Sequence, residues 1–368
     1  MRLGHFETLR PHCPVCRRND ESSRPLALAT VLKREGDIIV EGMLLCPNPA
    51  CQREYPILDG IPLLIADLRG YLAENLVHVI ARDDLSDVIE SVLGDCAGPG
   101  SWFDAMRQQV GSYARDHYGA DDPAEHDAHP PPGSAVRVLD AALATLGATP
   151  PRIPDEGPII DLGCSVGGTS FALAARATPD RLVLGVDQNL AMLRVASTAL
   201  RRGVVTYARR RTGVAYERRV IELSTTHAER VDFWACDAMA LPFDAGTFGF
   251  ATALHVLDSV RDPRALLVEI ARILRGGARV ALATPYDWSP AVTPLGHWIG
   301  GHSQRGPHGG DGAPVLRALL TPGAHPASVE GLELVSEIAA LPWHVRLHDR
   351  STVEYQVHVV VAQRAVAG

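Results

Sequence analysis

Short apolar runs alternate with amphipathic segments along the last two thirds of the chain. Apolar runs of strand length lie at residues 157–162, 181–187, 231–236, 248–254 and 278–284. Helical periodicity lies between them, at residues 169–177, 190–202 and 263–274. Runs of this length predict buried strands, and their alternation with helices predicts a parallel sheet with helices on both faces. The sequence therefore predicts an α/β domain built on a doubly wound, Rossmann-like sheet.

The remaining patterns predict a hairpin and a helical cover. Residues 204–223 predict a β-hairpin that turns at Thr212-Gly213. Residues 119–134 are acidic and then rich in His and Pro, which indicates a mobile loop. Amphipathic patterns predict helices at residues 72–80, 85–93 and 102–118. We therefore expect an amino-terminal domain, a helical cover with a mobile linker, and the α/β domain, at residues 1–66, 67–134 and 135–368.

Composition favours a soluble globular protein. The chain has 368 residues, 46% of them hydrophobic, and no apolar run approaches 20 residues. Because the amino terminus carries no signal-peptide pattern, we expect a cytoplasmic protein. The net charge of −8 disfavours broad electrostatic binding to RNA or DNA. A cluster of arginines around the hairpin, which either meets an anionic partner or forms an ordinary solvated surface, is the local exception: Arg201, Arg202, Arg209, Arg210, Arg211, Arg218 and Arg219.

A turn rich in small residues separates the first strand of the α/β domain from its helix. The turn is Gly163-Cys164-Ser165-Val166-Gly167-Gly168. Glycines let the backbone approach a ligand closely, and the start of a helix offers unpaired N–H groups to polar or anionic atoms. The turn therefore predicts a nucleotide-like ligand, and the alternative is a tight turn without one. Ser165 occupies a position at which nucleotide-binding turns usually carry glycine.

Polar residues follow the next three strands. Asp187 lies 24 positions after Gly163, where an acid at the tip of the neighbouring strand accepts both ribose hydroxyls of a nucleotide. Asp237 follows the third strand, at a position that suits a carboxylate contacting an adenine amino group, and His255 follows the fourth. Doubly wound sheets bind ligands beyond the carboxyl ends of their strands, so these side chains are expected to share one site.

Four motifs occur in order along residues 158–361: DLGCSVGG, LGVDQN, CDAMALPFDAGTFGF and ILRGGARVALATPY. In this order and spacing they resemble the class I S-adenosylmethionine (SAM) methyltransferases. The resemblance implies a seven-stranded sheet that binds the methionine part of SAM at the glycine turn, the ribose at Asp187 and the adenine at Asp237. The cofactor-binding residues that it implies are Asp161, Gly163, Cys164, Ser165, Gly167, Asp187, Gln188, Asp237, Ala238 and His255. A dehydrogenase is disfavoured, because the turn lacks the G-x-G-x-x-G order.

A narrower resemblance lies in the last third of the chain. The segments TPYDWS, HWIGG and LPWHVR, at residues 284–289, 297–301 and 341–346, are similar to the mercaptohistidine N-methyltransferase domain of ovothiol biosynthesis. The insertion at residues 204–223 is also similar to that family. This resemblance implies methyl transfer to a nitrogen or sulfur of a histidine-derived or other heteroaromatic amine.

Aromatic residues of these segments are candidates for a substrate wall. Tyr286, Trp288, Trp298 and Trp343 lie in segments that otherwise predict loops. Rings in such positions can enclose a flat substrate or a sulfonium cation. Ordinary packing at the edge of the sheet is the alternative.

The expected chemistry depends mainly on positioning. Methyl transfer is an in-line displacement, and holding the nucleophile against the methyl carbon supplies much of the acceleration. Arg346 or Arg350 is a candidate partner for a substrate carboxylate. A base is needed only if the acceptor carries a proton, and the candidates are His255, Tyr286 and Asp287.

Four cysteines near the amino terminus form two closely spaced pairs. Two residues separate Cys13 from Cys16, and four separate Cys46 from Cys51. Such pairs are typical of structural Zn²⁺ held by four thiolates, and the alternatives are reduced structural cysteines or disulfides of a secreted protein. The run at residues 55–64 resembles the small zinc-ribbon proteins that partner RNA and protein methyltransferases. The resemblance implies a structural or docking role for this segment.

These features together predict a SAM-dependent methyltransferase that acts on a small molecule. One alternative is a tRNA or rRNA methyltransferase whose zinc ribbon and hairpin arginines bind phosphates. The other is a non-catalytic protein that binds SAM without transferring its methyl group.

Overall fold

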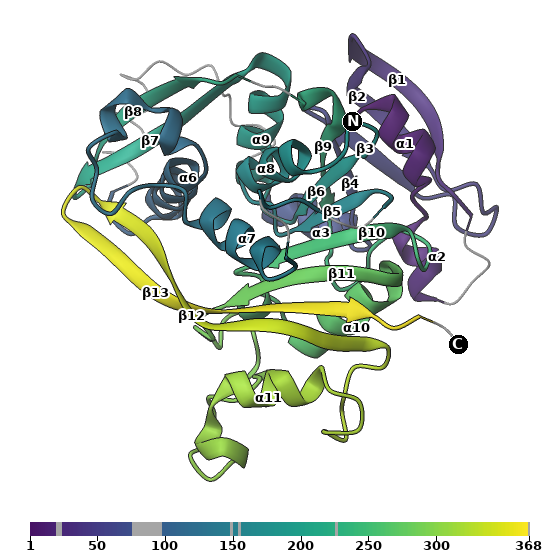
Figure 1. Cartoon of the computed structure of the whole chain (residues 1–368). Coiled ribbons are helices and arrows are strands. Elements are labelled where there is room, and N and C mark those ends of the chain that lie inside the picture. The colour runs from purple at the N-terminus through teal and green to yellow at the C-terminus, as the bar shows by residue number, and fades with distance from the viewer. Residues whose placement is uncertain (20–23, 76–97, 148–149, 154–155, 225–226, 367–368) are drawn as a thin grey trace.

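One large sheet runs through the computed structural model, which describes residues 1–19, 24–75, 98–147, 150–153, 156–224 and 227–366. Within these residues, eleven strands pair in the order β1-β2-β3-β4-β9-β6-β5-β10-β11-β13-β12 (Figure 1). They are β1 Ala27–Glu35, β2 Ile38–Leu45, β3 Glu54–Leu58, β4 Ile61–Leu64, β5 Ile159–Leu162, β6 Val183–Asp187, β9 Val231–Cys236, β10 Phe248–Leu254, β11 Leu274–Thr284, β12 Leu332–His348 and β13 Ser351–Arg364. A separate hairpin joins β7 (Val204–Thr212) to β8 (Ala215–Glu222) and turns where the sequence predicts.

The carboxyl-terminal part of the sheet has seven strands. Strands β9, β6, β5, β10 and β11 pair in parallel, and β13 and β12 continue the sheet in antiparallel fashion. Apolar side chains of alternating orientation enter two cores, and helices cover both. One core receives α7 (Ser134–Ala144), α8 (Gly168–Arg176) and α9 (Leu190–Arg202), and the other receives α10 (Pro263–Ile273) and α11 (Gly312–Leu319). The doubly wound sheet predicted from the sequence is therefore confirmed.

The amino-terminal segment extends the same sheet. Strands β1 to β4 pair in antiparallel order, and β4 then pairs in parallel with β9, with Leu63 opposite Ala235. Two short helices, α1 (Leu3–Leu9) and α2 (Pro14–Arg18), accompany these strands (Figure 1). Residues 38–45 form the single continuous strand β2 between the two cysteine pairs. The expected boundary at residue 66 thus follows a strand that belongs to the shared sheet.

Helices α3 (Leu68–Glu74) and α6 (Trp102–Tyr118) form the described part of the helical cover. Helix α6 has the bounds that its amphipathic pattern predicts. The pattern at residues 72–80 runs beyond the described residues, and the pattern at 85–93 lies outside them. Side chains of α6 reach the glycine turn: Tyr118 Oη donates to the Val166 carbonyl at 2.6 Å, and His117 Nδ1 accepts from the Gly168 N–H at 2.9 Å.

The segment at residues 119–134, where the sequence indicates a mobile loop, makes buried contacts with the rest of the fold. Two short 3-10 helices, η1 (Gly119–Asp121) and η2 (Pro123–Glu125), occupy its first part. The Glu125 side chain is fully buried, and its Oε2 accepts from Arg115 Nε and Arg346 Nη1, each at 2.8 Å. A buried carboxylate needs such partners. These ion pairs therefore hold the segment against α6 and β12.

The long carboxyl-terminal hairpin of β12 and β13 corrects another expectation. Trp343 lies within β12, whereas the sequence indicates a loop there. Tyr286 and Trp288 follow β11 outside any strand, and Trp298 follows a 3-10 helix. The remaining 3-10 helices are η3 Ala228–Arg230, η4 Leu257–Ser259, η5 Leu295–His297 and η6 Pro307–Gly310. Among the described residues, no helix combines the length and apolar character needed to span a bilayer.

Candidate functional site

A cavity of about 760 Å³ opens at the carboxyl ends of β5, β6, β9 and β10. Its walls include most of the cofactor-binding residues that the sequence indicates. These are Gly163, Ser165, Asp187, Gln188, Asp237, Ala238 and His255. Tyr113 of α6 also lines the cavity. The sheet therefore brings together side chains from four strand ends, as the alternation of strands and helices leads one to expect.

The glycine turn lines this cavity and contains a buried hydroxyl without a partner in the described part of the chain. Ser165 has a positive φ of 52°, and its N–H donates to Asp187 Oδ2 at 2.9 Å. Its Oγ is buried and has no hydrogen-bond partner among the described residues. A buried polar atom without a partner is costly, so the turn is suited to a ligand that supplies one. Gly163 has a φ of 68°, and a Cβ there would lie 2.4 Å from Val256, so the turn requires glycine at this position.

The acid at the end of β6 is held by backbone donors. Asp187 Oδ1 accepts from the Asn189 N–H at 2.8 Å, in addition to the bond from Ser165 to Oδ2. Burial raises the pKa of Asp187, and these N–H groups oppose the rise by favouring the carboxylate. Each oxygen retains a lone pair, which is what a pair of ribose hydroxyls requires.

Three residues implied in cofactor binding lie beneath the cavity instead of lining it. The Asp161 carboxylate accepts hydrogen bonds from Thr252, Ser170 and Thr169 hydroxyls at 2.6, 2.7 and 2.7 Å. Its role in the described structure is to support the turn from below. Cys164 is fully buried in the apolar core. At Gly167 a Cβ would lie 2.5 Å from Phe233, so glycine there serves packing against the core.

His255 is shielded by aromatic rings. The Trp343 indole stacks on its imidazole with ring centroids 4.2 Å apart, and the Tyr355 ring meets it edge-on at 5.4 Å. His255 Nε2 is buried without a hydrogen-bond partner among the described residues. Burial lowers the pKa of His255 to about 4, so the ring is neutral near pH 7.

The proposed substrate wall does not form at this cavity. Tyr286 Oη contacts His358 Nδ1 at 2.7 Å, and the Trp288 and Trp298 rings stack on each other with centroids 6.1 Å apart. Neither these residues nor Asp287 line the cavity. Trp343 contributes only indirectly, through His255. The segment at residues 284–301 reaches the cavity through Ala291 and Val292, whereas its aromatic side chains pack elsewhere. Sequence proximity to β11 does not fix which residues of a loop face the site.

Arg346 is also committed elsewhere. Its guanidinium pairs with the buried Glu125 carboxylate. Releasing it for a substrate carboxylate would leave a buried charge with fewer partners, which is costly. The interpretation of Arg346 as a substrate-binding residue is therefore not supported by its contacts.

A comparison with known families identifies part of the chain. Residues 160–282 match the model of the methyltransferase domain family. This segment is therefore similar to methyltransferase domains. The acids at the ends of β6 and β9 line the cavity, and their carboxylate oxygens can accept further hydrogen bonds, as the hydroxyl and amino groups of SAM would require.

Individual relatives of the methyltransferase domain cover only parts of the chain. A demethylmenaquinone methyltransferase of Lactiplantibacillus plantarum is 29% identical over 148 residues, which are 40% of this chain and 53% of that protein. Ajmaline N-methyltransferase of Rauvolfia serpentina is 24% identical over 166 residues, 44% of this chain and 48% of that protein. The chain thus spans about half the length of these relatives.

Solved structures show a more distant similarity. A SAM-dependent methyltransferase of Methanosarcina mazei has 22% identity and a TM-score of 0.37, covering 58% of this chain and 93% of that one. A complex of the Haloferax volcanii Trm112 methyltransferase activator with a methyltransferase contains a chain with 16% identity and a TM-score of 0.39. That match covers 72% of this chain and 99% of the other.

Residues that the sequence did not indicate also line the cavity. Several come from the amino-terminal segment and α3: Arg18, Ile65, Asp67, Gly70, Tyr71 and Glu74. Tyr71 Oη donates to the Gln188 carbonyl at 2.8 Å. Others lie farther along the chain: Gln109, Met192, Ser259, Val260, Arg261, Ala291 and Val292. The amino-terminal residues reach the cavity because β4 pairs with β9. This pairing joins strands that are distant in the sequence, so local sequence patterns do not predict it.

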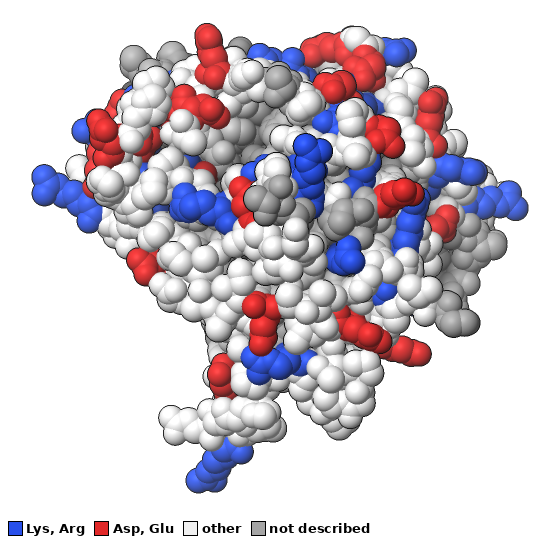
Figure 2. All heavy atoms as spheres, in the orientation of Figure 1, with Lys and Arg blue, Asp and Glu red and all other residues white. Residues whose placement is uncertain are grey.

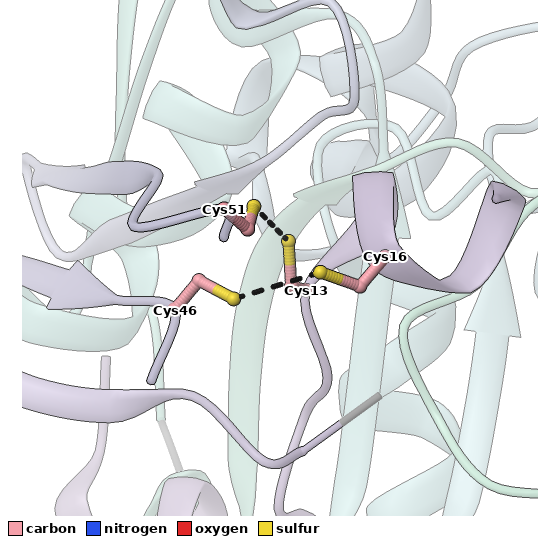
Figure 3. A group of neighbouring side chains, drawn as sticks. All are labelled: Cys13, Cys16, Cys46 and Cys51. Atoms are coloured by element: carbon pink, nitrogen blue, oxygen red, sulfur yellow. Dashed lines mark hydrogen bonds between the residues drawn. The ribbon is translucent and has the colours of Figure 1, made fainter. Parts of the chain in front are cut away.

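The four cysteines converge on one point, as Figure 3 shows. Their sulfur atoms all lie within 4.8 Å of one another, and the contacts Cys13–Cys51 and Cys16–Cys46 both measure 3.7 Å. Zinc–sulfur bonds of about 2.3 Å in a tetrahedron place neighbouring sulfurs about 3.8 Å apart, whereas disulfide sulfurs are about 2 Å apart. The geometry fits a four-thiolate metal site and excludes disulfides.

The surroundings of the cysteine cluster also suit a metal. Tyr55 Oη lies 3.1 Å from Cys13 Sγ, and Asn48 Nδ2 donates to Cys16 Sγ at 3.5 Å. Burial raises the pKa of the Cys16 thiol to about 11 and raises that of Cys46 further. Without a cation, these buried thiols are therefore protonated near neutral pH, and a bound metal would hold them as thiolates.

Most arginines of the hairpin cluster already have acidic partners. Arg209 Nε lies 3.0 Å from Asp349 Oδ1, and Arg219 Nε donates to Asp122 Oδ2 at 2.9 Å. Other carboxylates within 4 Å pair with Arg201, Arg210 and Arg211. On the face drawn in Figure 2, acidic and basic side chains of the described residues are interspersed. The cluster thus lacks the continuous positive surface on which phosphate binding depends.

Proposed function

We propose that the whole protein transfers the methyl group of SAM to a small-molecule acceptor. The observation that carries this proposal is one cavity that combines Asp187 and Asp237 with the glycine turn at Gly163 and Ser165. Asp187 accepts the ribose hydroxyls, Asp237 and Ala238 bind the adenine, and the turn at Gly163 and Ser165 holds the methionine part. When bound, SAM supplies an electrophilic methyl group on a sulfonium cation.

His255 suits the reacting end of this site. Its lowered pKa keeps the imidazole neutral, so the ring does not repel a neighbouring sulfonium cation. His255 lines the cavity, so its ring can contact the acceptor. A group with a pKa of about 4 is a weak base near pH 7. The role that we propose for His255 is therefore to position an acceptor that needs no strong base.

A heteroaromatic amine meets this requirement, because its nitrogen carries a lone pair at neutral pH. The motifs similar to mercaptohistidine N-methyltransferases point to the same class, and we propose a histidine-derived or related heteroaromatic acceptor. Val260, Arg261 and Val292 replace the earlier aromatic candidates as its contacts, since they line the cavity beside Ser259. The aliphatic side chains can pack against a ring, and Arg261 can meet an acceptor carboxylate.

Two observations favour a small molecule over RNA. The cavity volume of about 760 Å³ lies within the range of about 300–1,000 Å³ typical of small-molecule sites. The arginines that would bind phosphates in the RNA alternative are mostly paired with carboxylates. An RNA substrate would have to displace these acidic side chains.

Incubation with methyl-labelled SAM and a cell extract tests the proposal. The extract is then separated into small metabolites, RNA and protein, and we expect label in the small metabolites. Label confined to RNA or protein would refute the small-molecule acceptor. Asp187→Asn should abolish transfer, whereas the exposed Asp180→Asn should retain it. Tight binding of SAM without label in any fraction would instead identify a non-catalytic SAM-binding protein.

A further inference from the structure

The last residue of α2 links the cysteine cluster to the cavity. Arg18 Nη2 lies 2.9 Å from Asp237 Oδ2, and both residues line the cavity. Asp237 Oδ1 accepts from the Met239 N–H at 2.9 Å. The Asp237 side chain is 16% exposed, against 49% for Arg18. Arg18 and Met239 therefore hold the two carboxylate oxygens of a largely buried acid in one orientation.

Helix α2 depends on the cysteines for its position. It has five residues and no side-chain hydrogen bond at its amino-terminal cap. Helices of this length are unstable in isolation, because nucleation is not repaid by enough hydrogen bonds. Cys13 directly precedes the helix and Cys16 lies within it, and both belong to the cluster. The cluster therefore sets the direction from which Arg18 approaches Asp237.

We propose that Arg18 is a positioning residue for the adenine of SAM, and that metal in the cysteine cluster controls cofactor affinity through it. This inference rests on the proposed function, because it takes SAM as the ligand of the cavity. An adenine amino group donates best to a carboxylate that is already oriented, since no side-chain freedom is lost on binding. Without Arg18, the Asp237 carboxylate can rotate toward solvent, and the bound adenine must restrain it.

The neighbouring arginine provides a matched control. Arg17 lies on the same short helix and carries the same charge, but it faces Asp244 at 3.6 Å and does not line the cavity. General destabilisation of α2 would affect the Arg17 and Arg18 variants alike. An effect confined to Arg18 would follow from its contact with Asp237.

Calorimetry of the zinc-loaded full chain with S-adenosylhomocysteine tests the proposal. Arg18→Met should weaken binding about tenfold, a coupling of ordinary size for linked sites. Arg17→Met should bind as the wild type does, and Arg18→Lys should recover part of the affinity because it keeps a positive charge. A wild type that does not bind would refute the proposed function. A wild type that binds, with Arg18→Met binding equally well, would refute this inference alone.

Two further measurements separate positioning from general support. S-inosylhomocysteine carries a carbonyl where adenine has its amino group, so wild type should prefer the adenosyl compound and Arg18→Met should lose most of that preference. Zinc removal by a chelator should weaken the binding of S-adenosylhomocysteine to the wild type by a similar factor. The affinity of Arg18→Met should not change on zinc removal. If chelation weakens the affinity of Arg18→Met by the same factor as that of the wild type, the two effects are independent. That result would refute the proposal that the metal acts through Arg18. If circular dichroism shows that the chelated chain unfolds, the test is the preference of Arg18→Met for the adenosyl over the inosyl compound. A preference as strong as that of the wild type would refute the positioning role of Arg18.

Discussion

The Trp343 indole lies against the His255 imidazole, with ring centroids 4.2 Å apart and an angle of 24° between the planes. Tyr355, from the other strand of the carboxyl-terminal hairpin, closes a second side of the imidazole. Through these two rings, β12 and β13 shield a residue that lines the cavity. The shielding explains why burial lowers the pKa of His255 to about 4.

Stability should therefore depend on pH through His255. The folded-state pKa of about 4 lies below the ordinary value of 6.5, so the unfolded chain binds more protons between these values. The stabilising contribution is complete above pH 6.5 and is lost as the pH falls toward 4. Urea unfolding measures the free energy of unfolding at pH 7 and at pH 5. Between these pH values, the free energy of unfolding of His255→Gln should fall by up to about 2 kcal/mol less than that of the wild type. An exposed control, His302→Gln, should behave as the wild type does. Equal losses in His255→Gln and the wild type would contradict the assignment.

Cofactor binding should be sensitive to the charge at position 187. Asp187→Asn preserves size but removes one acceptor and the negative charge, and hydrogen bonds to charged groups contribute about 1.5–3 kcal/mol each. We expect S-adenosylhomocysteine to bind at least about tenfold more weakly, as measured by calorimetry. Unchanged affinity in this variant would contradict the placement of the ribose.

The cysteine cluster should bind one metal ion per chain. Metal analysis of the purified protein should find about one zinc, as four-thiolate sites of this geometry hold a single ion. Cys46→Ser should lose the metal and lower the melting temperature, because metal binding contributes to folding. Cys236→Ser, which lies outside the cluster, should retain the metal. Zinc retained at full stoichiometry in Cys46→Ser would refute the site.

The buried ion pairs of Glu125 should matter for stability. Its side chain is fully buried, and it lies within ion-pair distance of Arg115, Arg209 and Arg346. Glu125→Ala leaves these arginines without their shared carboxylate, and removal of one partner from a buried pair costs about 3–5 kcal/mol. Urea unfolding measures this loss. Glu229, whose side chain is 68% exposed, provides a control in Glu229→Ala that should change stability by less than about 0.5 kcal/mol.

The sequence predicts those elements whose signals are local. The apolar strands, the helix at residues 190–202 and the hairpin turn at Thr212 have patterns that a few neighbouring residues define. The segment at residues 119–134 shows the limit of such signals. Its acidic and proline-rich composition indicates a loop, but Glu125 is buried by arginines that are distant in the chain. The composition of a segment does not predict ion pairs with residues that are distant in the sequence.

Prediction of the site divides in the same way. Ser165, Asp187 and Asp237 line the cavity because strand ends of a parallel sheet converge, and the sequence contains that rule. Tyr286 and Trp288 do not line it, since the path of the loop after β11 depends on its packing. Arg18 could not be foreseen either. Arg18 lies at the cavity because β4 pairs with β9, and the sequences of these two strands do not predict their pairing.

The pairing of β4 with β9 also bears on how this polypeptide can be shortened. A fragment beginning at residue 135 would retain every motif of the methyltransferase domain, yet it would expose the backbone donors and acceptors of β9 along an open edge. Exposed edges of this kind recruit strands from other molecules. Self-association, in place of a smaller monomeric enzyme, is therefore the expected fate of such a fragment.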